Sequence, residues 1–131
     1  MKNCNVNVWY VRPGILEEVA VITFDGDIET LPGEQRGVIE AAPETLICMQ
    51  AHDAVFVADK PLVWKSHEGN LPSWIEVRLD SPRELKLVLG DVAEREVAKF
   101  VVNLETEDGV FTSKDPTVVN DPVNMPPTGG R

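Results

Sequence analysis

Apolar and polar residues alternate along much of this chain, in short runs separated by turn residues. The clearest runs are residues 75–79 and 85–89, which flank the turn Asp80-Ser81-Pro82-Arg83. Side chains on a strand point to its two faces in turn, so the apolar residues of both runs can share one buried face. The pattern therefore predicts a β-hairpin at 75–89.

Similar runs recur at roughly 8–12-residue spacing, which is typical of an antiparallel sandwich or barrel. Further strands are predicted at 4–11, 18–24, 37–41, 46–50, 54–58, 62–64, 100–104 and 110–119. Residues 91–99 also fit a short helical turn, because Asp91 and Glu94 have the spacing of a capping box. The fold class that follows is all-β: an antiparallel sandwich of seven to nine strands.

The chain of 131 residues has the length of one domain. Five of its last ten residues are proline or glycine, which resist pairing in a sheet. We therefore expect a single β-sandwich domain at 1–119 and a flexible Pro/Gly-rich tail at 120–131.

The second half of the chain resembles small bacterial β-sandwich domains of cupredoxin-like or immunoglobulin-like type. The features that carry the resemblance are Trp64 at a strand end, Gly69 in a polar loop, the run 75–79, Ser81-Pro82, the run 100–102, the turn at Gly109 and Asp115-Pro116-Thr117-Val118-Val119. The resemblance implies a closing strand at 115–119 with a kink at Asp115-Pro116. It implies a fold more than a function, because such domains carry no assigned activity.

The net charge is −10, from 22 acidic against 12 basic residues, and the sequence contains no cluster of Lys and Arg. A phosphate backbone is bound by clustered cations, so we expect no contact with nucleic acid or with an anionic membrane. No apolar run has the length of a membrane span or of a leader peptide, which favours a cytoplasmic location. Cys4 and Cys48 are then buried thiols, whereas export would allow a disulfide between them.

Two places in the sequence contain residue types that bind metal ions. The residue types of a blue-copper site are present as Cys48, Met49, His52 and His67. However, that site requires a histidine before the cysteine in the sequence, and no histidine precedes Cys48. Asp25, Asp27 and Glu29 place three carboxylates in one turn, as calcium prefers, although a solvated hairpin turn explains them equally. We therefore expect no cofactor, with Cys48, His52 and the three carboxylates as weak metal candidates.

Catalysis has one candidate segment, Ser66-His67-Glu68. A catalytic triad needs a base that is oriented by a carboxylate and an oxyanion hole, and neighbouring residues on a loop do not establish that geometry. The sequence therefore favours a protein that is not an enzyme.

A binding surface is suggested by Trp74. Continued alternation places Trp74 on the polar face of Glu76 and Arg78, and half-exposed tryptophans are common anchors of interfaces. We expect a contact surface formed by Trp74, Glu76, Arg78 and the 65–73 loop with His67. The alternative is that Trp74 packs beneath that loop.

Three functions follow from these observations. The first is a soluble, non-catalytic interaction or accessory module whose partner is another protein or a second copy of the chain. The second is a metal or small-ligand binder at the loop ends near Asp25, His52 and His67. The third is an acidic inhibitor that mimics nucleic acid and binds a basic protein, which requires one continuous acidic face.

Overall fold

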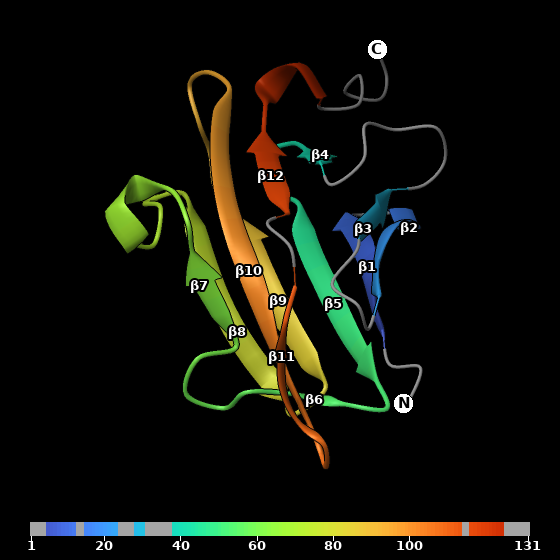
Figure 1. Ribbon diagram of the computed structural model, residues 1–131. Helices are drawn as coiled ribbons and strands as arrows, with labels where there is room; N and C mark the ends of the chain where they lie inside the picture. The colour runs from blue at the N-terminus through green and yellow to red at the C-terminus, as the bar shows by residue number, and fades with distance from the viewer. Residues whose placement is uncertain (1–4, 13–14, 24–27, 31–37, 114–115, 125–131) are drawn as a thin grey trace.

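Two β-sheets pack face to face and form the described part of the chain (Figure 1). The computed structural model describes residues 5–12, 15–23, 28–30, 38–113 and 116–124. These residues form twelve strands: β1 (Asn5–Arg12), β2 (Ile15–Thr23), β3 (Ile28–Thr30), β4 (Val38–Ala41), β5 (Leu46–His52), β6 (Val55–Phe56), β7 (Leu62–Trp64), β8 (Ile75–Ser81), β9 (Glu84–Leu89), β10 (Glu96–Thr106), β11 (Gly109–Thr112) and β12 (Thr117–Asn120). The predicted all-β sandwich is confirmed.

The first sheet has the strand order β3-β2-β1-β5-β9-β8, and all of its pairs are antiparallel. The predicted hairpin forms its β8–β9 edge, where Ile75 is opposite Leu89 and Leu79 is opposite Leu85. Their side chains share the inner face, as the alternation requires. Strand β8 is therefore one edge of this sheet.

The second sheet is built around β10, which spans eleven residues and pairs with four strands. Strands β11 and β12 lie on one side of β10, and the short strands β6 and β7 pair with it as well. Strand β12 pairs with β4 in parallel, which departs from the purely antiparallel prediction. Parallel neighbours need a long crossover, and the many residues between β4 and β12 supply it.

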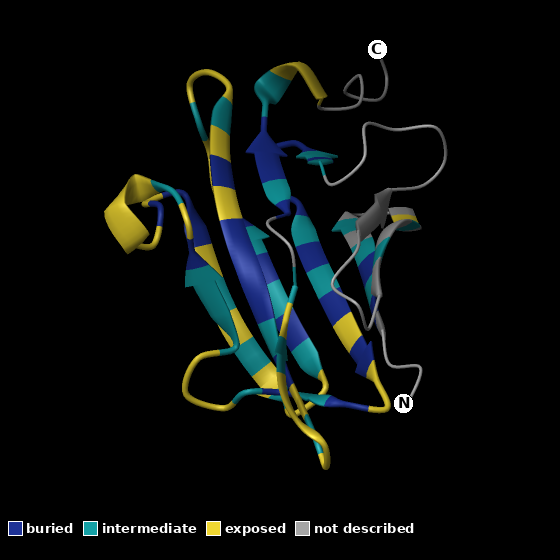
Figure 2. Cartoon of the chain, viewed as in Figure 1, coloured by how far each residue is buried: buried dark blue, intermediate teal, exposed yellow. Residues whose placement is uncertain are grey.

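The core lies between the two inner faces. Figure 2 shows buried positions along β10, where Ala98, Phe100, Val102 and Leu104 face the core; Val101, between two of them, is buried as well. Phe100 is fully buried and meets Trp64 edge to face, with ring centroids 5.7 Å apart. The short helical turn that the sequence allowed at 91–99 is not formed. Strand β10 begins at Glu96, and no helix is found within that segment.

The strand count exceeds the seven to nine predicted for two reasons. Strand β3 has only three residues, too few to give an alternation of its own, and the short runs expected at 54–58 and 62–64 are separate strands, β6 and β7. The return strand predicted at 110–119 is also two strands, β11 and β12, separated by residues 113–116. The kink that the resemblance implied at Asp115 lies outside the described residues.

The predicted tail begins too early. Asn120 is the last residue of β12 and is fully buried, and its amide Nδ2 donates to the Gly90 carbonyl at 3.0 Å. A 3₁₀ helix, η2 (Pro122–Asn124), follows. Proline fits the start of a helix, because the backbone N–H that it lacks would have no hydrogen-bond partner within the helix at that position. Residues 120–124 thus pack on the domain, and 125–131 lie outside the described residues.

Candidate functional site

Trp74 does not form the exposed anchor that alternation predicts. It is 9% exposed and belongs to the core, together with Ile75. Trp74 precedes β8 and lies in a turn, where the Ile75 amide donates to the Pro72 carbonyl at 3.1 Å and the Gly90 amide donates to the Trp74 carbonyl at 2.8 Å. The alternation of β8 therefore does not extend back to residue 74, and the side chain is turned inward.

Glu76 and Arg78 are exposed on the outer face of the first sheet, as predicted. Arg78 lies 3.5 Å from an Asp80 oxygen, and Lys86 binds the same carboxylate at 2.7 Å. The hydrogen bond from Lys86 lowers the pKa of Asp80 below its usual value. His67 lies elsewhere, on the 3₁₀ turn η1 (His67–Gly69) that follows β7 of the second sheet. The predicted contact surface is therefore divided between two sheets.

The weak metal candidates do not come together. Cys48 and His52 are four residues apart on β5 and point to the same face, which separates them by roughly 13 Å at the usual strand rise. Asp25 and Asp27 lie outside the described residues, and of Glu29 only the backbone in β3 is described. Among described residues, no group of three His, Cys, Asp or Glu side chains could hold a metal ion.

An apolar patch covers part of the outer face of the first sheet, where a solvent-facing sheet normally carries polar residues. Two cross-strand rows form it, since Val11 is opposite both Leu16 and Leu46, and Trp9 is opposite Cys48. Leu46 is opposite Val88, which extends the first row. We call this set the outer patch; its members are Trp9, Val11, Leu16, Leu46, Cys48 and Val88.

The outer patch contains a cavity of about 270 Å³ lined by Trp9, Leu16, Cys48 and Gln50. Leu16 is 70% exposed, and Trp9 and Cys48 are half-buried. The alternation of residues 4–11 predicts Trp9 on the face of Asn5 and Asn7, and this outward placement is correct because its neighbour Val8 is fully buried. The other members of the patch were not predicted from the sequence. The alternation of residue types also places Leu46 and Cys48 on the outward face, because their neighbours Ile47 and Met49 are fully buried.

Cys48 is a free thiol whose pKa is raised, chiefly by burial. The positive charge of Lys86, the residue opposite Cys48 on β9, partly offsets this by lowering the pKa. Glu84 and Asp80 act in the same direction as burial and raise it. The thiolate is the nucleophile in thiol chemistry, so this environment suppresses the reactivity of Cys48.

These charges predict how Cys48 is alkylated. In a Cys4→Ser background, the rate of iodoacetamide labelling should reach half its plateau at a higher pH than for a free cysteine. Lys86→Gln should move that midpoint further up, and Glu84→Gln should move it down, because the two side chains have opposite effects on the thiol pKa. The midpoint reports the pKa independently of access. Equal midpoints in all three proteins would contradict this account.

A second distinctive site is the turn after β7. Ser66 Oγ lies 2.8 Å from His67 Nδ1 and accepts a hydrogen bond from the Lys99 amide at 2.9 Å. The next three residues, His67, Glu68 and Gly69, all have positive φ, at 57°, 55° and 81°. This backbone conformation is strained for residues with a side chain. The sequence suggested Ser66 and His67 by type, and the structure joins them by a direct contact.

The Ser66–His67 contact lacks the rest of a catalytic apparatus. Within the described residues no carboxylate is hydrogen-bonded to the His67 ring, which is exposed. A base that activates a serine needs such an orienting group. The described residues therefore place Ser66 and His67 in contact without an orienting carboxylate.

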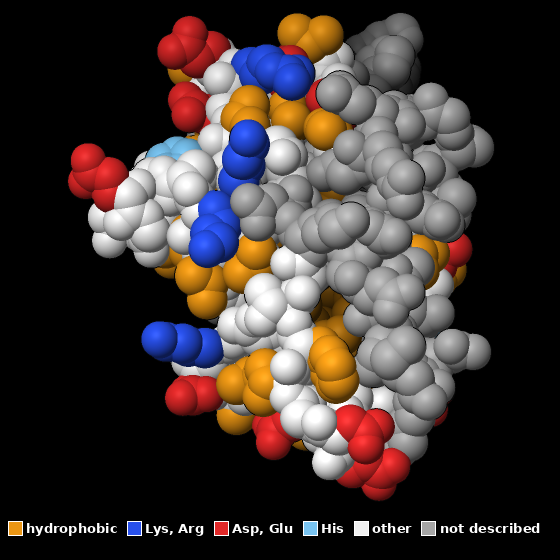
Figure 3. Space-filling view, viewed as in Figure 1, with side chains coloured by type: hydrophobic (Ala, Val, Ile, Leu, Met, Phe, Trp, Pro, Cys, Tyr) orange, Lys and Arg blue, Asp and Glu red, His pale blue; other side chains and the backbone are white. Residues whose placement is uncertain are grey.

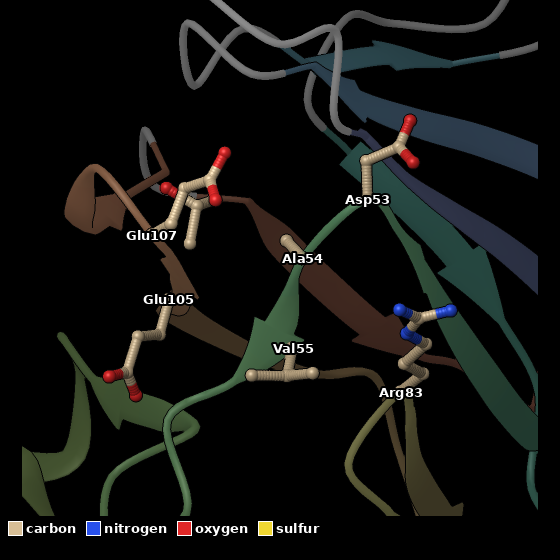
Figure 4. A pocket seen from close by; sticks show the side chains of 7 residues that line it. Asp53, Ala54, Val55, Arg83, Glu105 and Glu107 are labelled. Atoms are coloured by element: carbon tan, nitrogen blue, oxygen red, sulfur yellow. The ribbon is translucent and has the colours of Figure 1, made fainter.

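A polar hollow of about 470 Å³ lies at one end of the sandwich, where the β5–β6 corner meets two hairpin turns (Figure 4). Arg83 and Asp53 lie on one side of it, and Glu105 and Glu107 lie on the other. Figure 4 shows these carboxylates pointing in different directions. The hollow thus lacks the converging side chains that a metal or a catalytic site requires.

Comparison with known proteins yields no match to a family model, to a curated protein or to a solved structure. In the described part of the chain, no helix has the length and apolar character needed to cross a membrane.

Proposed function

We propose that this protein is a non-catalytic interaction module that associates with a second copy of itself through the outer patch. The observation that carries the proposal is the partly exposed apolar patch on the outer face of the first sheet, where Leu16 is 70% exposed and lines one hollow with the half-buried Trp9. Contiguous exposed apolar surface on a water-facing sheet commonly marks an interface. Tryptophan is also enriched among residues that dominate binding energy.

Charge around the outer patch supports a second copy as the occupant. Two molecules of net charge −10 repel each other, so they can meet only where local charge is balanced. The adjoining strands β8 and β9 come close to that balance, since they carry two basic residues, Arg78 and Lys86, against three acidic ones, Glu76, Asp80 and Glu84. A two-fold interface pairs one patch with itself, so a patch bearing both signs can place acid opposite base.

Some finer features are part of the same proposal. Two packed sheets with a mainly antiparallel pairing support an immunoglobulin-like or cupredoxin-like type of sandwich. The free thiol of Cys48 supports a cytoplasmic location, where thiols stay reduced. The face seen in Figure 3 does not supply the continuous acidic surface that the acidic-mimic alternative requires, because it carries Lys and Arg side chains in its interior and acidic groups toward its rim.

Self-association predicts a concentration-dependent mass. Light scattering coupled to size exclusion should show the wild type passing from monomer to dimer as its concentration rises through the micromolar range. Leu16→Glu should leave a monomer at every concentration and weaken association at least tenfold, or about 1.4 kcal/mol, because it buries a charge without a partner. Trp9→Ala should also weaken self-association.

Val123→Glu is the matched control. Val123 is 87% exposed on η2, away from the first sheet, so the same change of charge should leave the dimer intact. A wild type that remains monomeric throughout overturns the proposal, as does an equal loss of association in Leu16→Glu and Val123→Glu.

A further inference from the structure

Two lysines face each other on the outer side of the second sheet. Trp64 of β7 is opposite Phe100 of β10, and the next pair along these strands is Lys65 and Lys99. The Lys65 amide donates to the Lys99 carbonyl at 2.7 Å, which confirms that the two residues are directly opposite. Trp64 and Phe100 are buried, so alternation turns both lysine side chains outward, where they are exposed.

This lysine pair is unfavourable as it stands. Like charges directly opposite each other on antiparallel strands destabilise the sheet. The chain carries 22 acidic residues, yet neither ammonium forms an ion pair in the described part of the structure. In contrast, Arg78, Lys86 and Arg95 are all ion-paired. An anion placed between the two ammonium groups would relieve their repulsion.

The strained turn adjoins the lysine pair and adds polar groups to it. Ser66 follows Lys65, and its hydroxyl accepts the Lys99 amide hydrogen in place of the strand ladder. The same hydroxyl contacts His67 Nδ1 at 2.8 Å, so the imidazole ring and the Lys99 amide share one partner. The other ring nitrogen, Nε2, has no hydrogen-bond partner among the described residues. The two opposed lysines and His67 are therefore neighbours in the fold, because Lys65 precedes Ser66 and the Ser66 hydroxyl contacts both the Lys99 amide and the imidazole ring.

We propose that Lys65, Lys99 and His67 form a binding site for a phosphate group. A phosphate monoester carries about two negative charges and three acceptor oxygens, which matches two ammonium groups and a ring N–H. A long polyanion fits poorly, because the acidic side chains at the rim of this face would repel its flanks (Figure 3). The ligand class is thus a small phosphate-bearing molecule. The site is separate from the outer patch, so neither proposal depends on the other.

Thermal unfolding in inorganic phosphate tests the site, with sodium chloride at equal ionic strength as the reference. Phosphate at about ten times its Kd should raise the wild-type Tm by roughly 3–8 °C more than chloride does. Lys99→Glu should fold, because it converts a repulsive pair into an attractive one, and should show a higher Tm than the wild type without phosphate. The phosphate-specific rise should be lost in this variant and in Lys65→Gln.

Lys60→Gln is the control, because Lys60 is an exposed lysine outside the pair; it should retain the full response. In ¹H–¹⁵N spectra of the wild type, phosphate should shift the amide signals of Lys65, Ser66, His67 and Lys99. The proposal is overturned if chloride matches phosphate, if Lys99→Glu keeps the response, or if Lys60→Gln loses it. An equal rise with acetate would replace the phosphate assignment by a site for any small anion.

Discussion

Replacing Phe100 with alanine is expected to lower the free energy of unfolding by about 3–5 kcal/mol, the largest loss of any aliphatic or aromatic truncation in this domain. Phe100 is fully buried at the centre of β10, the strand that pairs with four others. Its removal deletes the edge-to-face contact with Trp64 and leaves a cavity between the two sheets. Close-packed cores relax only partly around such a cavity.

Urea unfolding followed by tryptophan fluorescence measures this change, because Trp64 touches the mutated side chain. Val110→Ala is the matched control, since Val110 is 60% exposed on the β10–β11 hairpin and should change stability by less than about 0.5 kcal/mol. If Phe100→Ala lowers the free energy of unfolding by no more than Val110→Ala does, the two sheets do not share the core described above.

The core and its hairpins follow from the alternation of residue types, because a strand that buries one face must repeat every second residue. This rule correctly placed Ile75, Leu79, Leu85 and Leu89 inward and Trp9 outward. It failed at Trp74, because alternation holds only within a strand and a turn sets the orientation there. The parallel pairing of β4 with β12 is likewise beyond a local rule, since it depends on contacts across most of the chain.

The candidate sites were harder to predict, because each of them is assembled across strands. Lys65 and Lys99 are 34 positions apart in the sequence, so no cluster of cations is visible before β7 and β10 are paired. The outer patch has the same origin, since Leu16, Val11 and Leu46 come from three strands. Residue types identified Ser66 and His67, but only the pairing of β7 with β10 placed Lys99 beside them.

Asn120 provides a second test with a large expected effect, at the residue where the sequence predicted a tail to begin. Asn120→Asp should lower the free energy of unfolding by about 4 kcal/mol or more near neutral pH, because it buries a carboxylate. Asn120 is fully buried, and among the described residues its side chain forms one hydrogen bond, the donation to the Gly90 carbonyl, which a carboxylate oxygen would repel. Within the part of the chain that the structure describes, neither Asn120 Oδ1 nor the buried Thr45 Oγ1 has a hydrogen-bond partner.

The decrease in the free energy of unfolding caused by Asn120→Asp should depend on pH in a defined direction. Burial raises the pKa of the new carboxyl in the folded state, whereas the unfolded chain keeps an ordinary value near 4. Below roughly pH 4 both states are protonated and the carboxylate penalty disappears; it grows as pH rises from there to the folded pKa and is constant above it. Urea unfolding from acid to neutral pH measures this slope relative to the wild type.

Asn70→Asp makes the same chemical change at an exposed position after η1 and should show no such slope. If the difference in the free energy of unfolding between Asn120→Asp and the wild type is the same at every pH in this range, residue 120 is solvated, as a residue in a tail would be. A slope confined to Asn120→Asp would place the end of the folded domain beyond β12. The reason is physical: only a side chain enclosed by both sheets is deprived of the water that a carboxylate needs.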